Sequence, residues 1–221
     1  MERTYRIGTR RSSLALKQVE EVINSLKKFY REFSYEIIGI DTYGDKDKFT
    51  PISEIEGTDF FTKEIEEALL RGEIDFAVHS AKDLPDNIPE GLIIACITKS
   101  IDPYDALVSK NDLKIAELPL AAKIGASSSR RKNHLKRYRE DFQIIDIRGN
   151  IEERLEKLDK DGLDAIVVAA SALMRLGLEE RIVQRIPFEI LRPHPLQGSL
   201  AVEVKKDNKE LINLLRVLDG K

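Results

Sequence analysis

The sequence predicts an α/β protein of two domains, with a double crossover between them and an interdomain cleft. Apolar runs of strand length alternate with segments of helical periodicity along the chain, a pattern typical of sheets covered by helices. Asp102-Pro-Tyr-Asp105 interrupts the alternation and indicates a crossover into a second unit. The late apolar run Leu200–Val204 indicates a strand that returns to the first sheet. We therefore expect one domain over residues 1–98 plus 199–217, a second over 104–193, and parallel sheets.

The first domain is expected to begin with a strand at Tyr5–Gly8, after which Ser12 or Ser13 caps a helix that extends to Tyr30. Residues 42–60 have little pattern of their own, so we expect either an active-site loop or a passive surface loop there. The other elements expected in this domain are a strand at Tyr35–Ile40, a helix marked by Phe61, Ile65, Ala68 and Leu69 and ended by Gly72, a strand at Phe76–Val78 and a strand at Leu92–Ile97.

The second domain repeats the alternation of strands and helices. Asn150 is a helix N-cap with Glu153 three residues later, which is the spacing of a capping box. The elements expected here are a strand at Lys123–Ala126, a helix opened by Ser127–Arg131, a strand at Gln143–Ile147, a helix from Asn150 to Gly162, a strand at Ala165–Ala169 and a helix from Ser171 to Leu176.

Composition excludes several classes of protein. The 221 residues carry a formal net charge of −3, which argues against a nucleic-acid partner. The longest apolar run, Ala165–Met174, is too short to span a membrane, and the amino terminus lacks the apolar region of a signal peptide. We therefore expect a cytoplasmic protein.

The single cysteine, Cys96, lies in an apolar strand and should be a buried thiol. The histidines lack metal-site spacing, so no metal is expected.

Charged side chains follow a buried strand of the first domain. His79, Ser80, Lys82 and Asp83 come after the strand, and Pro85 prevents its continuation. Ligands bind at the carboxyl ends of strands in open α/β sheets. A lysine beside an aspartate offers a cation for an anionic ligand and a carboxylate for proton transfer or for N–H groups. The alternative is a surface turn with a solvated ion pair.

Arginine is concentrated at strand ends and helix starts. A helix amino terminus attracts anions through its backbone N–H groups and dipole, and seven arginines exceed what one monoanion needs. The sequence therefore predicts a polyanionic ligand, although any one of these arginines taken alone is as well explained by a solvated surface charge. No nucleotide phosphate-loop or dinucleotide-binding motif is present. The arginines are Arg10, Arg11, Arg130, Arg131, Arg148, Arg154 and Arg175.

These motifs resemble the porphobilinogen deaminase (hydroxymethylbilane synthase) family in order and approximate spacing. The matching segments are Arg6–Leu16, Ala77–Pro85, Gly125–Arg131, Asp146–Asn150 and Leu173–Leu178. The resemblance implies two periplasmic-binding-protein-like domains. It also implies a transferase of heme biosynthesis that joins porphobilinogen units into a linear tetrapyrrole with release of ammonia. The acidic substrate and the growing linear pyrrole would be the predicted polyanion.

The resemblance also implies a role for each matching residue. Asp83 would be the catalytic carboxylate, and Phe61 would pack against a pyrrole ring. The implied dipyrromethane cofactor would be held by Lys82, Asp83, Ser128, Arg130, Arg131, Arg148 and Gly149. The substrate would be held by Arg10, Arg11, Ser12, Phe61, Arg148, Arg154, Arg175 and Gln197.

The sequence departs from the family pattern in several places. The usual Gly-Lys-Gly-Leu-Phe is here Gly57-Thr-Asp-Phe-Phe61, the usual Val-Gly-Gln-Gly-Ala is Pro195-Leu-Gln-Gly-Ser199, and Ser129 replaces a leucine. The family's third domain, whose cysteine anchors the cofactor, is expected to be absent, and Cys96 matches no anchoring position. The cofactor would then be non-covalent or absent.

Four interpretations follow from these departures. The chain is a short monomeric deaminase, a fragment that needs a separate third-domain protein, or a non-catalytic relative that binds a carboxylated pyrrole or bilane. The fourth, an effector domain of a regulator, is disfavoured by Lys82 and Asp83 and by the lack of a DNA-binding segment.

Overall fold

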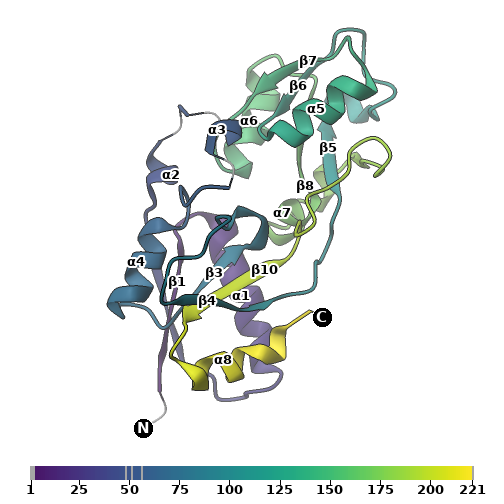
Figure 1. Ribbon diagram of the computed structural model, residues 1–221. Coiled ribbons are helices and arrows are strands. Elements are labelled where there is room, and N and C mark those ends of the chain that lie inside the picture. The colour runs from purple at the N-terminus through teal and green to yellow at the C-terminus, as the bar shows by residue number, and fades with distance from the viewer. Residues whose placement is uncertain (1–2, 48, 51, 56, 221) are drawn as a thin grey trace. The chain divides into compact units, whose positions relative to one another are not determined.

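The computed structural model describes residues 3–47, 49–50, 52–55 and 57–220. The chain divides into two compact units, and most of their helices and strands are labelled in Figure 1. The first unit comprises Met1–Asp47, Gly57–Ile101 and Ser199–Lys221, and the second comprises Lys48–Glu56 and Asp102–Gly198. Each unit contains a five-stranded sheet.

The sheet of the first unit is mixed, whereas we expected it to be parallel. Its order is β2-β1-β3-β10-β4, and β10 runs antiparallel to both of its neighbours. The reversal arises because the returning chain enters at the carboxyl end of β3, where Leu200 pairs with Ser80. The predicted return of the late strand to this sheet is thus confirmed. The strands are β1 (Tyr5–Arg10), β2 (Tyr35–Ile40), β3 (Phe76–Ser80), β4 (Leu92–Ile97) and β10 (Leu200–Lys205).

Local sequence signals explain where the helices of this unit begin and end. The Ser12 hydroxyl caps α1 by accepting a hydrogen bond from the Ala15 N–H at 3.3 Å. Gly72, with φ of +73°, ends α4 in the left-handed conformation that favours glycine. The helices are α1 (Ser13–Lys27), α2 (Tyr43–Lys46), α4 (Lys63–Arg71) and α8 (Lys209–Leu215), with 3₁₀ turns η1 (Ala81–Asp83) and η4 (Arg216–Leu218).

Segment 42–60 is more structured than the expected loop. It contains the one-turn helices α2 and α3 (Ile52–Ile55), while residues 48, 51 and 56 lie outside the described part of the chain. The α2 turn forms because Thr42 and Asp45 make a capping box, a signal that the sequence carried and that we did not use.

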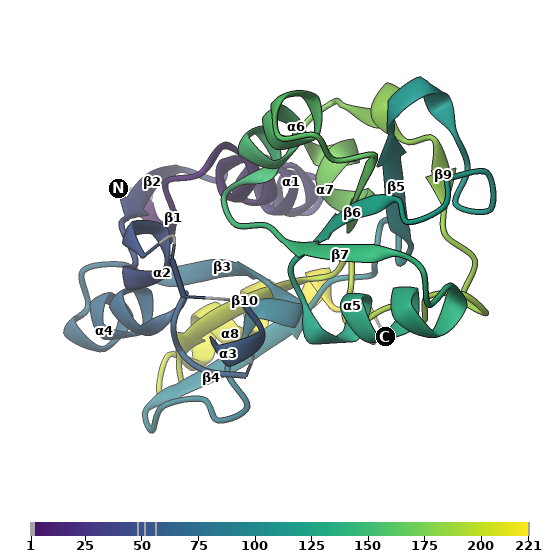
Figure 2. The same cartoon turned by 90° about the horizontal axis from the view of Figure 1, so that it is seen from above.

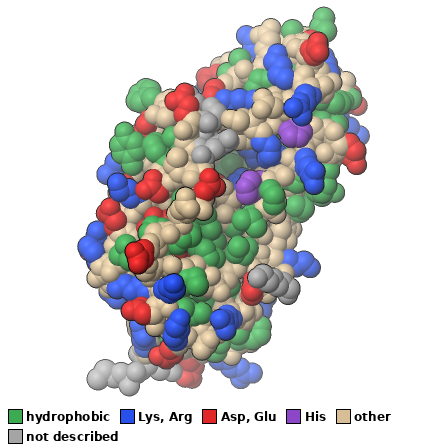
Figure 3. Space-filling view, viewed as in Figure 1, with side chains coloured by type: hydrophobic (Ala, Val, Ile, Leu, Met, Phe, Trp, Pro, Cys, Tyr) green, Lys and Arg blue, Asp and Glu red, His purple; other side chains and the backbone are tan. Residues whose placement is uncertain are grey.

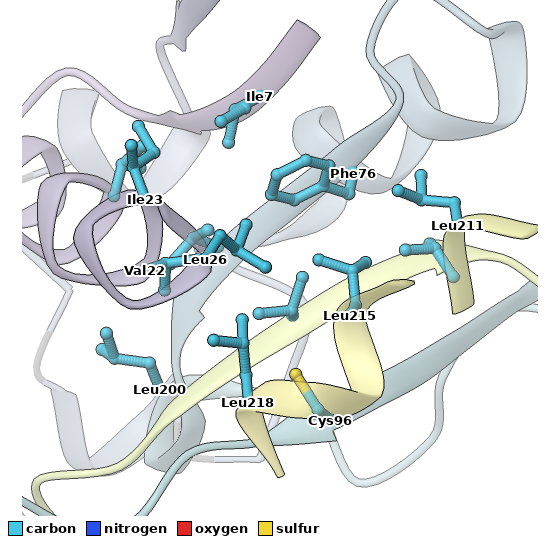
Figure 4. Packing of buried hydrophobic residues seen from close by; sticks show 14 of the residues in the cluster. Ile7, Val22, Ile23, Leu26, Phe76, Cys96, Leu200, Leu211, Leu215 and Leu218 are labelled. Atoms are coloured by element: carbon cyan, nitrogen blue, oxygen red, sulfur yellow. The ribbon is translucent and has the colours of Figure 1, made fainter. Parts of the chain in front are cut away.

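Side chains of alternating strand positions pack on the two faces of the first sheet. Phe76 and Val78 of β3 lie in one cluster with Val202 and Val204 of β10 and with residues of α1 and α8. Figure 4 shows Cys96 in this cluster, beside the leucines of α8 and η4. Ala77 points to the opposite face, where it packs with α4.

The second sheet has the order β7-β6-β8-β5-β9 and is also mixed, since β5 runs antiparallel to β8 and β9. Strands β5 and β9 were not predicted from the sequence, and Asp105, which was expected to end the crossover, is the first residue of β5. The strands are β5 (Asp105–Ser109), β6 (Lys123–Ala126), β7 (Gln143–Asp146), β8 (Ala165–Ala169) and β9 (Gln184–Arg185).

Helices α5 and α6 of the second unit begin at predicted caps, whereas α7 begins at Ala170, one residue before the expected Ser171, without a side-chain cap. Ser128 accepts a hydrogen bond from the Arg131 N–H, and the capping box of Asn150 and Glu153 is present. Figure 2 shows α5 and α6 on opposite faces of the sheet, as two right-handed crossovers in opposite directions require. The helices are α5 (Ser129–Tyr138), α6 (Ile151–Lys160) and α7 (Ala170–Arg175), with 3₁₀ turns η2 (Lys110–Asp112) and η3 (Glu179–Arg181).

Candidate functional site

A pocket opens at the carboxyl end of the central strands of the first unit. It lies where β1 and β3 end and α1 begins, the region in which open α/β sheets bind ligands. Among its lining residues, Arg10, His79 and Asp83 carry titratable side chains. The full lining is Thr9, Arg10, Ser12, Leu14, Ala15, Gln18, Phe61, Thr62, Val78, His79, Ser80 and Asp83.

Arg10, the last residue of β1, is held in the pocket wall by two contacts. Its Nε donates to the Asp45 carboxylate at 3.0 Å, and a terminal guanidinium nitrogen donates to the same carboxylate. Its Cζ lies 4.6 Å from the centre of the Phe61 ring, which is a cation–π distance. Burial alone would raise the pKa of Asp45, but hydrogen bonds and charge from Arg10, with hydrogen bonds from Thr42, hold that pKa below its ordinary value.

Of the predicted site residues in η1 and at the start of α1, some line the pocket and others do not. Asp83 is exposed and lines the pocket, as Ser12 does. Lys82 is half-buried and is not among the lining residues. Arg11 is also outside the lining and pairs with Asp41 at 3.3 Å on the surface. The strand itself runs through His79 to Ser80, so His79 lies within β3 and not after it as expected.

In the second unit, a buried aspartate forms ion pairs with two of the predicted arginines. Asp105 is fully buried, and its Oδ1 accepts hydrogen bonds from the Arg131 Nε at 2.9 Å and a terminal nitrogen at 2.6 Å. Its Oδ2 accepts from Arg130 at 2.8 Å. The Arg131 side chain is only 6% exposed whereas that of Arg130 is 24% exposed, so Arg130 is the more accessible cation of the two.

The turn after β7 is built around Gly149. Its φ is +111°, and a Cβ there would lie 2.4 Å from a carboxylate oxygen of Glu153, the capping-box partner of α6. The Gly149 carbonyl accepts a hydrogen bond from the Arg154 Nε at 2.8 Å, and the Lys157 Nζ donates to the Arg148 carbonyl at 2.9 Å. Arg148 and Arg154 therefore lie at one turn, as their spacing predicts.

The remaining two predicted residues contact the connections at the edge of the second unit. Arg175, at the end of α7, donates to the Gly198 carbonyl at 2.8 Å. Gln197 is fully buried and donates from Nε2 to the Pro103 carbonyl at 2.9 Å. The Gln197 side chain thus ties together the outgoing and returning connections of the chain.

Sequence reasoning missed the acidic partners of the arginines. Asp45 and Asp105 lie 35 and about 25 positions from their partners along the chain, and no local pattern indicates such pairs. Side chains of both signs are also interspersed over the visible surface in Figure 3. Gln18, whose Nε2 donates to the Ser80 hydroxyl at 2.9 Å, and Thr62 were missed as pocket residues as well.

Cys96 is 3% exposed, which confirms the predicted buried thiol. Burial, with a smaller contribution from the Asp219 charge, raises its pKa to about 12.

Within the described residues no group of three or more His, Cys, Asp or Glu side chains is placed to hold a metal ion. The helices of the described ranges include none with the length and apolar character that crossing a membrane requires.

The chain matches one protein family over most of its length. The family model described as "Porphobilinogen deaminase, dipyromethane cofactor binding domain" matches residues 5–213. The porphobilinogen deaminase of Natranaerobius thermophilus is 51% identical over 215 residues, which cover 97% of this chain and 69% of the relative. That of Pelotomaculum thermopropionicum is 45% identical, with coverages of 99% and 70%. The chain thus spans about two thirds of the length of these relatives.

Solved structures with a similar fold include two proteins of low sequence identity. Immunogenic lipoprotein A from Vibrio vulnificus has a TM-score of 0.58 at 13% identity and covers 96% of this chain and 94% of its own. The methionine binding protein MetQ has a TM-score of 0.57 at 13% identity, with coverages of 96% and 88%. These likenesses support the predicted periplasmic-binding-protein-like fold.

Proposed function

Because the chain belongs to the porphobilinogen deaminase family, whose members are transferases of heme biosynthesis, we propose that it joins porphobilinogen units head to tail. Each addition forms a carbon–carbon bond between two pyrroles and releases one ammonia. Four units joined in this way make up one linear tetrapyrrole.

The observation that supports this proposal is that Arg10 and Asp83 line the same pocket. Porphobilinogen carries two carboxylates, a pyrrole N–H and an aminomethyl group, so it presents both anions and N–H donors. A guanidinium binds a carboxylate with charge-assisted hydrogen bonds. A carboxylate on the same wall accepts an N–H and stabilises positive charge that develops on the pyrrole as the amine leaves. Asp83 is the residue that we assign to this catalytic role.

Phe61 is assigned to the ring of the substrate. It lines the pocket beside Arg10, and its aromatic face suits packing against a pyrrole. Ser12 lines the same pocket and adds a hydroxyl, while Arg11 extends the positive charge at the start of α1. Segment 42–60 is assigned as the active-site loop, because Asp45 in its first turn contacts Arg10.

The donors of the second unit suit the acidic side chains of a dipyrromethane cofactor. Arg130 is partly exposed beside the Ser128-capped start of α5, and a helix amino terminus with hydroxyl and guanidinium donors favours carboxylates. When bound, this cofactor supplies the pyrrole carbon to which the first substrate is joined. The residues that we assign to it are Lys82, Asp83, Ser128, Arg130, Arg131, Arg148 and Gly149.

The acidic groups of the substrate and of the growing product are assigned to the other arginines. Arg148 and Arg154 meet at the Gly149 turn, and Arg175 and Gln197 lie by the connections of the second unit.

Covalent attachment of the cofactor does not fit Cys96. The thiolate is the reactive form of cysteine, and burial with a pKa of about 12 leaves almost none of it at neutral pH. Cys96 is the single cysteine of the sequence. We therefore propose that Cys96 is not the attachment point and that the residues assigned above hold the dipyrromethane through ionic contacts and hydrogen bonds.

Consumption of porphobilinogen by the purified protein, with added dipyrromethane or linear tetrapyrrole as primer, tests the proposal. Asp83→Asn keeps the size of the side chain and removes its charge, so turnover should fall by roughly 100-fold or more. Binding of a carboxylated bilane should survive. Asp83→Glu retains the charge and should keep part of the activity.

Asp86→Asn is the matched control, since Asp86 is exposed, close in sequence and outside the pocket lining. Equal consumption by the unmutated protein and Asp83→Asn would show that Asp83 is not catalytic. Tight bilane binding without any consumption would instead support the non-catalytic relative.

A further inference from the structure

Three ionisable side chains lie in the core of the first unit: Glu66 on α4, His79 on β3 and Glu203 on β10. These residues are 3%, 6% and 0% exposed. Ala201 pairs with His79 across the ladder and Glu203 pairs with Ala77, so His79 and Glu203 are diagonal neighbours on one face of the sheet. The His79 Nε2 lies 3.1 Å from the Glu203 Oε2.

Glu66 joins them from the helix that covers this face. The apolar residues of α4 pack against Ala77, and Glu66 interacts electrostatically with both Glu203 and His79. The Oε1 atoms of Glu66 and Glu203 are buried and have no hydrogen-bond partner among the described residues. Buried polar atoms normally have a partner, so these two oxygens need an explanation.

The charge balance of the cluster provides one. If both carboxyls ionised, the core would hold two negative charges against at most one imidazolium, and an uncompensated buried charge is strongly unfavourable. Burial is the main cause that raises the pKa of Glu66, and the interactions with Glu203 and Asp59 raise it further. A hydrogen bond with Thr62 and the interaction with His79 lower it. Burial therefore favours the protonated form of Glu66.

His79 connects this cluster to the pocket. His79 and Thr62 line the pocket together with Arg10 and Asp83. The 3.1 Å contact between the His79 Nε2 and the Glu203 Oε2 holds the orientation of the His79 ring.

We propose that Glu203 and Glu66 are positioning residues for the reaction at this pocket and act through His79. Glu203 sets the orientation of the ring. Glu66 keeps this pair intact by remaining neutral beside it. The link to turnover rests on the proposed function, whereas the link to ligand binding at the pocket does not.

A pH series on matched variants tests the proposal. As Glu66 ionises with rising pH, a negative charge enters beside the His79–Glu203 pair and disturbs the ring, so activity should fall. Glu66→Gln cannot ionise and should shift this alkaline fall to higher pH. Glu67→Gln is the control: it is the same change at the next residue of α4, on an exposed side chain, and its profile should follow that of the unmutated protein.

Glu203→Gln tests the other half of the proposal. It removes the charge that fixes the ring and should lower kcat roughly tenfold or more, with a smaller change in KM. Urea unfolding at each pH separates loss of function from loss of fold. If Glu203→Gln does not fold, the test relies only on the shift that Glu66→Gln causes in the pH at which activity falls.

The outcomes separate this inference from the proposed function. Superimposable pH profiles for the unmutated protein and Glu66→Gln overturn the inference, as does full activity in folded Glu203→Gln. If the unmutated protein consumes no porphobilinogen, the proposed function fails and the same variants are compared by the pH dependence of binding to a carboxylated bilane. A shifted binding profile in Glu66→Gln then supports the cluster's role, and an unshifted one overturns it.

Discussion

Asp45 accepts hydrogen bonds from two nitrogens of Arg10 at the wall of the first unit's pocket. The guanidinium proposed to bind a substrate carboxylate thus already holds a carboxylate of the protein. A ligand carboxylate must replace Asp45 or share the guanidinium with it, so the strength of this ion pair opposes ligand binding.

Asp45→Asn should therefore tighten the binding of a carboxylated bilane several-fold, because the competing charge is removed while an oxygen that can orient Arg10 remains. Arg10→Gln should weaken the same binding. Isothermal titration of both variants measures the two effects. Glu36→Gln, an exposed change on the edge strand β2, is the control. Weaker binding in Asp45→Asn would show that Asp45 supports the ligand and does not compete with it.

Asp75 provides a prediction about acid stability. Burial would raise its pKa, but hydrogen bonds from the Arg6 side chain and backbone, with one from Arg3, bring that pKa below the ordinary value. The unfolded state therefore binds a proton more readily than the folded state, so the stabilisation is present above the unfolded pKa and is lost as pH falls through the folded one.

Asp75→Asn should accordingly lower the free energy of unfolding by about 1 to 2 kcal/mol near neutral pH. The difference from the unmutated protein should shrink as the pH is lowered below about 4. Urea unfolding across this range measures it. A difference that stays constant with pH would rule out the ionised carboxylate as its source.

Gly149 provides a prediction about the turn that places Arg148 and Arg154. Alanine there must adopt φ near +111° and push aside the Glu153 carboxylate, so Gly149→Ala should cost about 1 to 3 kcal/mol of stability. Gly162→Ala is the matched control, because its φ is also positive but a Cβ would meet nothing within 4 Å. Equal losses in the two variants would mean that backbone strain, and not the Glu153 contact, sets the cost.

Cys96 provides a prediction about thiol chemistry. Its burial and its pKa of about 12 should make it react slowly with a thiol reagent in the native protein and fast in denaturant. Cys96→Ser should leave bilane binding largely intact. Mass spectrometry that found a dipyrromethane adduct on Cys96 would contradict this assignment.

The elements with strong local signals were predictable. Ser12, Ser128 and the Asn150–Glu153 box set helix starts from their own short segments. Strand β5 was not predicted, because Asp105 at its start resembles a turn residue and its strand conformation depends on pairing with distant β8. Helix α8 was missed although Leu211, Ile212 and Leu215 have helical spacing.

The candidate site was predictable in its cations but not in their partners. Arg130 and Arg131 stood out by position, yet their charge is offset by Asp105, which reaches them only when two distant segments meet. The buried carboxyls Glu66 and Glu203 gave no signal, since each sits in an otherwise ordinary helix or strand. Sequence patterns reveal local geometry, whereas long-range charge compensation appears only after folding.

The order of strands in the first sheet also has a consequence for synthesis on the ribosome. In that sheet β4 pairs with β10 alone. Strand β4 therefore leaves the ribosome before its partner and cannot pair until translation has passed Lys205. The second sheet is complete once Arg185 has appeared. The unit encoded in the middle of the chain can therefore finish folding during translation before the unit encoded at its ends, and until then β4 presents an unpaired edge that a chaperone or another nascent chain can bind.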